Sequence, residues 1–295
     1  MRLTLDELAR RQARALAHYA ACHLCARHCG VPRAGGRAPC LVDDQVQLGG
    51  WGLHFGEEPE LTGQGGSGLV LFAGCNLACQ GCETHGFSRE LQGVRKASVA
   101  ELAGILLELE RRGAQTVQLV TPTHQLPVIV SAIARAARHG FARPLVWNCG
   151  GYESLEALAI LDGIVDVYLP DLKHGDDLEG RLTGVADYFT KTKECLREMF
   201  RQVGPLKVDA DGVARRGLLV RHLVLPDGAA RTKEALAFVA SLSPEVPVNV
   251  MAQYQPVYQL AGHPRLGRRV TPPEVEEAIR LAREAGLTRV MADGS

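Results

Sequence analysis

The sequence lacks several features that would point to particular classes of protein. No apolar run in its 295 residues approaches the roughly 20 residues that a membrane-spanning helix requires. There is no charge excess, since 33 Lys and Arg residues balance 33 Asp and Glu residues, which argues against a basic surface for nucleic acid. The first 21 residues mix acids and arginines among the apolar positions, unlike a secretory signal. We therefore expect a cytoplasmic protein that binds neither membranes nor nucleic acid.

Cysteine, in contrast, is plentiful and unevenly placed. Of nine cysteines, four lie between Cys22 and Cys40 and three between Cys75 and Cys82, while Cys149 and Cys195 stand alone. In a cytoplasmic chain, such clustering favours metal or redox chemistry over a disulfide scaffold. Apolar residues make up 46% of the chain, enough for a large core. The length suits one large α/β domain, or a barrel with a small appendage.

The first cysteine set follows a predicted amphipathic helix over residues 3–21 and lies in a loop rich in Gly, Pro and Arg. It consists of Cys22, Cys25, Cys29 and Cys40. A Cys-x-x-Cys start followed by two more cysteines suits a four-thiolate zinc site or an auxiliary iron–sulfur cluster. The alternative is a group of reduced, partly buried thiols. We treat these four residues as a candidate second metal site.

The second set follows an apolar stretch, residues 69–73, that predicts a strand. Cys75, Cys79 and Cys82 stand at spacings of four and three, with no further cysteine before Cys149. Three thiolates leave a four-iron cluster one ligand short, whereas a structural zinc site normally has four protein ligands. The spacing therefore predicts an iron atom open to another molecule. The competing interpretation is a zinc site completed by Glu83 or His85.

From residue 68 onward, apolar strands alternate with amphipathic helices. We predict strands over 69–73, 117–120, 145–147, 164–169, 218–225, 246–252 and 288–291. We predict helices over 99–112, 128–138, 154–161, 187–203, 232–242 and 273–285, the first of these begun by a capping box of Ser98 and Glu101. This alternation predicts an α/β fold with a parallel sheet covered by helices, with fewer units than an eight-stranded barrel.

Polar residues stand where the predicted strands end. In parallel α/β folds, the functional groups gather at the carboxyl ends of the strands. Beyond the cysteine loop, the candidates are Thr121, His124, Asn148, Asp171, Lys173 and Arg221. Each could be an ordinary solvated turn residue, but the recurrence in successive units predicts one shared site.

The motif CNLACQGC resembles the CxxxCxxC signature of the radical S-adenosylmethionine (SAM) superfamily. The segments CHLCARHCGVPR, LHFGEEPEL, LVTPTH, NCGGYE, VDVYLPDLKH, LVRHLVLP and NVMAQYQP are similar to the pyruvate formate-lyase-activating-enzyme-like group of that superfamily. The resemblance implies a partial (β/α)6 barrel over residues 67–295, with an N-terminal helix and Cys-rich extension over residues 1–66.

The same resemblance implies a 4Fe-4S cluster on Cys75, Cys79 and Cys82, with SAM on its open iron. Asp171 and Lys173, and with them Thr121, His124, Asn148 and Arg221, would bind the cofactor. The implied activity is reductive cleavage of SAM to a 5′-deoxyadenosyl radical, which abstracts hydrogen from a protein, peptide or small molecule. A flavodoxin or ferredoxin would supply the electron, and a glycyl radical enzyme is a candidate substrate. A non-catalytic zinc or iron–sulfur binding or assembly protein is the alternative.

Three positions depart from the pattern of that family. Gly81 stands where an aromatic residue usually precedes the third cysteine, and Glu83-Thr84 replaces the Gln-Asn of close relatives. The sequence TPTH, residues 121–124, occupies the place of a Gly-Gly-Glu-Pro motif. None of these changes removes an iron ligand, but all three concern the surroundings of the cofactor.

Overall fold

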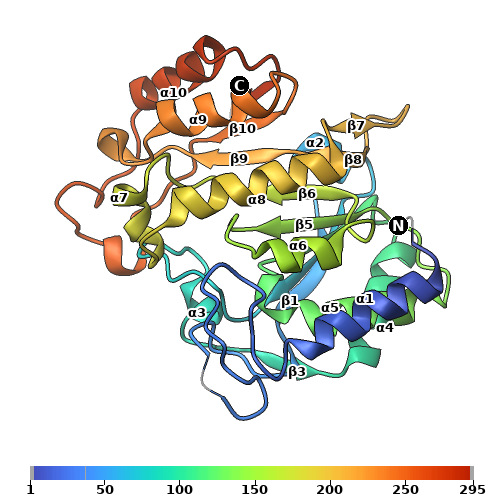
Figure 1. The fold of residues 1–295 in the computed structure, drawn as a ribbon. Helices are drawn as coiled ribbons and strands as arrows, with labels where there is room; N and C mark the ends of the chain where they lie inside the picture. The colour runs from blue at the N-terminus through green and yellow to red at the C-terminus, as the bar shows by residue number, and fades with distance from the viewer. Residues whose placement is uncertain (1–2, 37, 293–295) are drawn as a thin grey trace.

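A mixed β-sheet with a parallel centre, continued by a smaller parallel sheet, forms the middle of the computed structural model, which describes residues 3–36 and 38–292 (Figure 1). The larger sheet has the strand order β3-β1-β2-β4-β5-β6-β8-β7, and the smaller one β11-β10-β9. The strands of the larger sheet are β1 (Val46–His54), β2 (Ser67–Phe72), β3 (Arg95–Ala97), β4 (Thr116–Val120), β5 (Leu145–Cys149), β6 (Val167–Pro170), β7 (Lys207–Val208) and β8 (Ala214–Leu218). Those of the smaller sheet are β9 (Val220–Leu223), β10 (Val248–Met251) and β11 (Val290–Ala292).

Strands β2, β4, β5, β6 and β8 run parallel, as do β9, β10 and β11, which confirms the predicted parallel sheet. The prediction of one strand over 218–225 was wrong, because the chain changes partners at Leu219. β8 pairs with β6, whereas β9 pairs with β10. The two sheets remain joined at this point, since Leu219 N–H donates to the Tyr168 carbonyl at 3.0 Å and Asp171 forms an isolated parallel bridge with Arg221.

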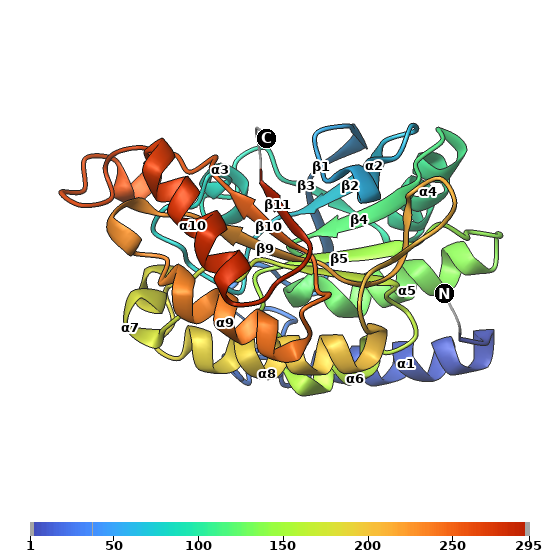
Figure 2. The same cartoon turned by 90° about the horizontal axis from the view of Figure 1, so that it is seen from above.

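Helices cover the sheets. They are α1 (Leu5–Ala17), α2 (Pro59–Thr62), α3 (His85–Ser88), α4 (Val99–Arg111), α5 (Leu126–Ala137), α6 (Leu155–Leu161), α7 (Asp177–Gly180), α8 (Tyr188–Val203), α9 (Thr232–Leu242) and α10 (Pro272–Glu284). Figure 2 shows α9, α8, α6 and α5 in a row along one face of the curved sheet, with α1 packed on α5 and α6. No helix in the described ranges combines the length and apolar character needed to cross a bilayer.

The helix over 99–112 confirms its predicted start. Ser98 Oγ accepts from the Glu101 N–H at 3.1 Å, and Glu101 Oε2 accepts from the Ser98 N–H at 2.7 Å. These two bonds satisfy backbone donors that the helix itself cannot pair. The apolar strands bury large side chains completely, among them Phe72, Trp147 and Tyr168.

Strand β1 is not among the strands predicted from the sequence. Its sequence, VQLGGWGLH, is rich in glycine, which has a low strand propensity. The pairing comes from the neighbouring strand instead, because β1 runs antiparallel to β2 from Leu48 to His54. The predicted domain boundary between residues 66 and 67 thus separates two adjacent strands of one sheet.

Candidate metal and cofactor site

The three closely spaced cysteines lie on the loop after β2, at the carboxyl end of that strand. Cys75, Cys79 and Cys82 are free, partly exposed thiols that line a cavity of about 350 Å³. The same cavity is lined by Thr121, Asn148, Asp171, Lys173 and Arg221. The structure therefore brings together every predicted candidate of this site except His124, as expected when the carboxyl ends of parallel strands share one edge.

A glycine fixes the start of the cysteine loop. Gly74 has a φ of 75°, and a Cβ at this position would lie 2.3 Å from the carbonyl oxygen of Cys40. That close approach lets the Cys75 N–H donate to the same carbonyl at 3.3 Å. Glycine is required here both by the left-handed backbone and by the close contact.

Backbone hydrogen bonds hold the rest of the loop. The N–H groups of Ala78 and Gln80 donate to the carbonyls of Thr183 and Leu182, each at 2.8 Å. On another side, Arg27 Nε donates to the Asn76 carbonyl at 2.6 Å. Segments far apart in the sequence thus position the thiols before any metal binds.

The thiol environment fits iron–sulfur ligation. Burial raises the pKa of the Cys75 thiol to about 12 and that of Cys79 to about 11. The Cys75 and Cys79 thiols therefore keep their protons at neutral pH, and metal binding would release them. Cys82 Sγ lies 3.2 Å from Ser88 Oγ and 3.4 Å from Thr84 Oγ1, hydroxyls able to donate to a thiolate. Three free thiols on one short loop at a cavity suit a cluster with one open iron.

A charge pair faces the thiols from the end of β6. Lys173 Nζ donates to Asp171 Oδ2 at 2.7 Å, and each side chain is a little under one third exposed. Burial works against the charge of Lys173, but Asp171 and then Cys79 outweigh it and raise its pKa well above the usual value. The site therefore presents a firmly cationic group and a carboxylate side by side.

A chain of hydrogen-bonded side chains crosses the inside of the sheet beneath the cavity. Asn148 Nδ2 donates to Gln118 Oε1 at 2.6 Å, and Gln118 Nε2 donates to Glu57 Oε2 at 3.2 Å. Glu57 is also paired with Arg221, and this arginine in turn pairs with Glu58. Arg221 Nε and Nη2 reach the two carboxylate oxygens of Glu58 at 2.7 and 2.6 Å.

Sequence reasoning did not select Glu57 or Glu58, because charged residues in a glycine-rich loop are usually only solvated. Glu58 is in fact 4% exposed and also accepts from Asn249 Nδ2 at 2.9 Å. The signal available in the sequence was the strand-end Arg221, whose burial requires an acidic partner somewhere in the chain. Arg221 is consequently held by these carboxylates, with its remaining surface turned to the cavity.

The first and last residues of the TPTH segment, Thr121 and His124, lie in different surroundings. Thr121 lines the cavity with a φ of 56°, a left-handed conformation that is rare for a β-branched residue. His124 lies outside the cavity lining and is 2% exposed, with Nε2 2.7 Å from the Ala73 carbonyl. Burial lowers the pKa of His124 to about 4, so its ring is neutral. This placement supports a role for His124 in holding the start of the cysteine loop rather than in touching a cofactor.

Gly81 faces the segment that follows β10. A Cβ at Gly81 would lie 2.8 Å from Leu260 Cδ1 and 3.8 Å from Tyr254 Cε2. The Gln259 N–H donates to the Gln80 carbonyl at 3.0 Å, which ties this segment to the cysteine loop. Leu260 and Tyr254 also line the cavity. The apolar side chains beside the third cysteine therefore come from a later part of the chain.

The first cysteine set gathers next to this loop, in the dark-blue segment that passes beside α3 in Figure 1. Cys22, Cys25 and Cys40 are buried and Cys29 is partly exposed, all as free thiols. Within residues 3–36 and 38–292, no three His, Cys, Asp or Glu side chains are placed to hold one metal ion. This holds for both cysteine sets, and also for Glu83 and His85.

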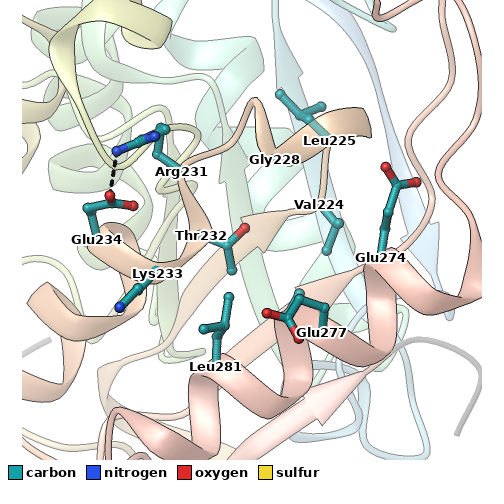
Figure 3. Close-up of a pocket in the computed structure, with 11 residues that line it drawn as sticks. Val224, Leu225, Gly228, Arg231, Thr232, Lys233, Glu234, Glu274, Glu277 and Leu281 are labelled. Carbon is teal, nitrogen blue, oxygen red and sulfur yellow. Dashed lines mark hydrogen bonds and ion pairs between the residues drawn. The ribbon is translucent and has the colours of Figure 1, made fainter.

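A second cavity, of about 370 Å³, lies between α9 and α10 (Figure 3). Four of its charged residues, Arg231, Glu234, Glu274 and Glu277, form ion pairs with one another or with neighbours. Arg231 bonds Glu234, as Figure 3 shows, and Glu274 bonds Arg268. None of the predicted site residues lines it. The cysteine-lined cavity is therefore the better candidate site.

Comparison with known proteins places the fold. No family model matches the chain. The chain is 29% identical over 276 residues to an uncharacterized protein of Methanocaldococcus jannaschii, covering 90% of this chain and 75% of that protein. Its structure matches a radical SAM methyltransferase from Sphaerobacter thermophilus with a TM-score of 0.51 and 14% identity, covering 99% of this chain and 93% of the other. The predicted α/β fold class is thereby confirmed over the whole chain.

Proposed function

We propose that this chain is a radical SAM enzyme, in which Cys75, Cys79 and Cys82 hold a 4Fe-4S cluster. The observation that carries the proposal is that these free thiols open onto one cavity shared with Asp171 and Lys173. The likeness in fold to a radical SAM methyltransferase supports it. When bound, the cluster and SAM supply one-electron cleavage of the sulfonium to a 5′-deoxyadenosyl radical that abstracts hydrogen from a substrate.

The side chains of the cavity suit the charges of SAM. Asp171 offers a carboxylate to a cationic group, and Lys173 an ammonium to a carboxylate, so the pair complements the amino acid end of the cofactor. Arg221, fixed by Glu58, keeps the polar floor of the cavity rigid. An apolar part of the lining excludes water and accommodates a base; it consists of Leu77, Leu182, Leu223, Leu225, Met251 and Leu260.

Anaerobic reconstitution of single Cys75→Ala, Cys79→Ala and Cys82→Ala variants tests the proposal. Each variant should lose 5′-deoxyadenosine production and the spectroscopic signal of a site-differentiated cluster. Cys195→Ser is the matched control, because Cys195 Sγ donates to the Glu153 carbonyl at 3.1 Å and a serine hydroxyl can keep that bond. A colourless wild-type protein that binds zinc and does not cleave SAM would instead support a non-catalytic metal-binding or assembly protein.

We further propose a flavodoxin or ferredoxin as electron donor and a protein or peptide as the substrate, with activation of a glycyl radical enzyme as the specific form. The sequence segments shared with the activating-enzyme-like group support this choice. The test is incubation of the reduced enzyme and SAM with a glycyl radical enzyme, followed by electron paramagnetic resonance (EPR). A glycyl radical signal supports activation. Accumulation of S-adenosylhomocysteine without that signal would indicate methyl transfer instead.

A further inference from the structure

The segment that carries Cys22, Cys25, Cys29 and Cys40 is folded tightly onto the body of the protein. The Ala26 N–H donates to the Tyr152 carbonyl at 3.2 Å, and the Ser154 N–H donates to the Leu24 carbonyl at 3.3 Å. Within the segment, the Gly30 N–H donates to the Cys22 carbonyl at 3.0 Å, which folds the loop back on itself. These bonds hold the part of the segment that carries Cys22, Cys25 and Cys29 in one compact loop.

Contacts within the segment hold the thiols near its folded-back backbone. Cys29 Sγ lies 3.9 Å from the Cys22 carbonyl oxygen, and the Cys22 N–H donates to the Val31 carbonyl at 3.3 Å. The thiols of Cys22, Cys25 and Cys40 are buried, and all four are free.

A buried arginine faces this group. Arg33 is 1% exposed, and its Nη1 donates to Cys40 Sγ at 2.9 Å. Its Nη2 donates to the carbonyls of His124 and Asp43 at 3.1 and 3.3 Å, while its Nε is buried without a hydrogen-bond partner. Across the described ranges, the ion pairs include none between Arg33 and a carboxylate. A buried guanidinium needs a counter-charge, and a thiolate at Cys40, which Arg33 already contacts, would supply one.

We propose that Cys22, Cys25, Cys29 and Cys40 hold a second 4Fe-4S cluster, with Arg33 as its charge partner. Four thiolates around an oxidised cluster give a net negative charge, which supplies the counter-ion that Arg33 lacks. The site takes iron and sulfide as its ligands, and its four cysteines leave no iron open to a substrate. This distinguishes it from the set of three at Cys75, Cys79 and Cys82.

A 4Fe-4S cluster and a zinc ion make different demands on four thiolates. On one zinc, four sulfurs at about 2.3 Å from the metal lie within about 4 Å of one another. In a 4Fe-4S cluster each thiolate binds a different iron, so the sulfurs stand farther apart. The iron and zinc contents of the reconstituted protein therefore distinguish the two.

This cluster lies next to the loop of Cys75, Cys79 and Cys82, which gives it a role in electron transfer. This role rests on the proposed function. The Cys40 carbonyl accepts from the Cys75 N–H at 3.3 Å, so a ligand of one cluster is hydrogen-bonded to a ligand of the other. Cys29, at the other side of the set, is partly exposed. A low-potential donor protein would reduce the outer cluster by one electron, and that electron would pass on to the inner cluster, restoring the outer one.

The test of the site uses the full chain with Cys75, Cys79 and Cys82 all replaced by alanine, reconstituted anaerobically with iron and sulfide. About four irons per chain and the EPR signal of a reduced 4Fe-4S cluster should remain, against about eight irons in the wild type. The reciprocal variant, Cys22→Ser with Cys25→Ser, should also retain about four irons. Loss of all iron from the triple variant, or one zinc per chain in its place, would overturn the proposal.

Arg33 provides a second, independent measurement. Arg33→Met removes a positive charge beside Cys40, so the reduction potential of the outer cluster should become more negative, whereas Arg33→Lys should keep it close to the wild-type value. An unchanged potential in Arg33→Met would refute the charge pairing. The Cys22→Ser, Cys25→Ser variant should cleave SAM with a chemical reductant but not with a donor protein. Residual iron in the triple variant without any SAM cleavage by the wild type would refute only the proposed function.

Discussion

Replacing Arg221 by methionine should destabilise the protein strongly, because it leaves a buried carboxylate without its cation. Glu58 is 4% exposed, and both of its oxygens are bound by the Arg221 guanidinium, at 2.7 and 2.6 Å. After the substitution, only the Asn249 amide, at 2.9 Å, remains from this network. Removing one partner of a buried ion pair typically costs about 3–5 kcal/mol. For a chain of this size the midpoint of thermal unfolding should fall by roughly 10 °C.

A double-mutant cycle isolates the pair itself. Glu58→Gln removes the negative charge but keeps the shape, so Arg221→Met with Glu58→Gln leaves no unpaired charge at position 58. Glu57, 13% exposed, loses Arg221 in both backgrounds and so cancels from the comparison. The double variant should recover part of the loss, with a coupling free energy of at least about 1 kcal/mol. Arg112→Met is the matched control, because Arg112 is about half exposed and its contact with Glu108 spans 3.4 Å at the surface. That substitution should leave the unfolding curve unchanged.

The dependence of stability on pH provides a further test of the pair of Glu58 and Arg221. Burial raises the pKa of Glu58, but the hydrogen bonds and charge of Arg221 outweigh burial and lower it below the usual 4.5. A lowered folded-state pKa contributes stability that is present above the unfolded value and is lost as the pH falls through the folded value. In Arg221→Met the Glu58 carboxyl is buried without its cation, so its pKa should rise. Protonation at low pH then removes the buried negative charge and the destabilisation that it causes. The deficit relative to the wild type should therefore shrink between pH 7 and pH 4.

Urea unfolding of the metal-free proteins at several pH values measures all three effects. The reasoning would be refuted by an Arg221→Met variant that loses less than about 1 kcal/mol at pH 7, or by single losses that simply add in the double variant.

Three further substitutions test other parts of the structure. Gly74→Ala should cost about 3 kcal/mol and abolish cluster assembly, because its Cβ would lie 2.3 Å from a backbone oxygen and the residue has a φ of 75°. The control, Gly104→Ala on the exposed face of α4, should stabilise the protein by about 0.5–1 kcal/mol. Equal unfolding midpoints for the two variants would contradict this prediction. Gly81→Ala should lower the midpoint by crowding Leu260. Leu260→Ala, which removes a buried side chain, should therefore lower the midpoint less in the Gly81→Ala background than in the wild type. An additive double variant in thermal unfolding would count against the contact. Burial lowers the pKa of His222 to about 4, so the free energy of unfolding should fall as the pH drops from about 6.5 to 4, by up to about 1.4 kcal/mol per pH unit. His222→Gln should reduce this dependence on pH. An unchanged dependence in urea titrations of the variant would contradict the assignment.

Much of the fold follows from local patterns. The capping box at Ser98 fixed one end of a helix predicted over 99–112, and α4 occupies Val99–Arg111. Apolar runs likewise located β2 and β4 to within two residues. The pattern failed where pairing depends on distant partners. β1 forms in a glycine-rich stretch because β2 has a free edge, and the break at Leu219 reflects the change of neighbour from β6 to β10.

The candidate site shows the same division. Strand ends placed Asn148, Asp171 and Lys173 at one cavity, because parallel strands deliver their carboxyl ends to one edge. The partners of buried charges were not predictable, since Glu58 reaches Arg221 across 163 positions of sequence. His124 was predicted with the strand-end group, but the turn after Pro122 directs its ring inward to the Ala73 carbonyl.

Gly81 illustrates how a departure from a sequence pattern can be balanced elsewhere in the fold. A side chain at this position requires the Leu260 side chain to move, because a Cβ alone would lie 2.8 Å from Leu260 Cδ1. Tyr254 is fixed beside it by a hydrogen bond from its hydroxyl to the Leu266 carbonyl at 2.8 Å. The apolar surface next to the third cysteine is thus supplied by residues about 170 positions later. Truncating Leu260 should therefore weaken SAM binding in a way that a larger residue at Gly81 can partly restore.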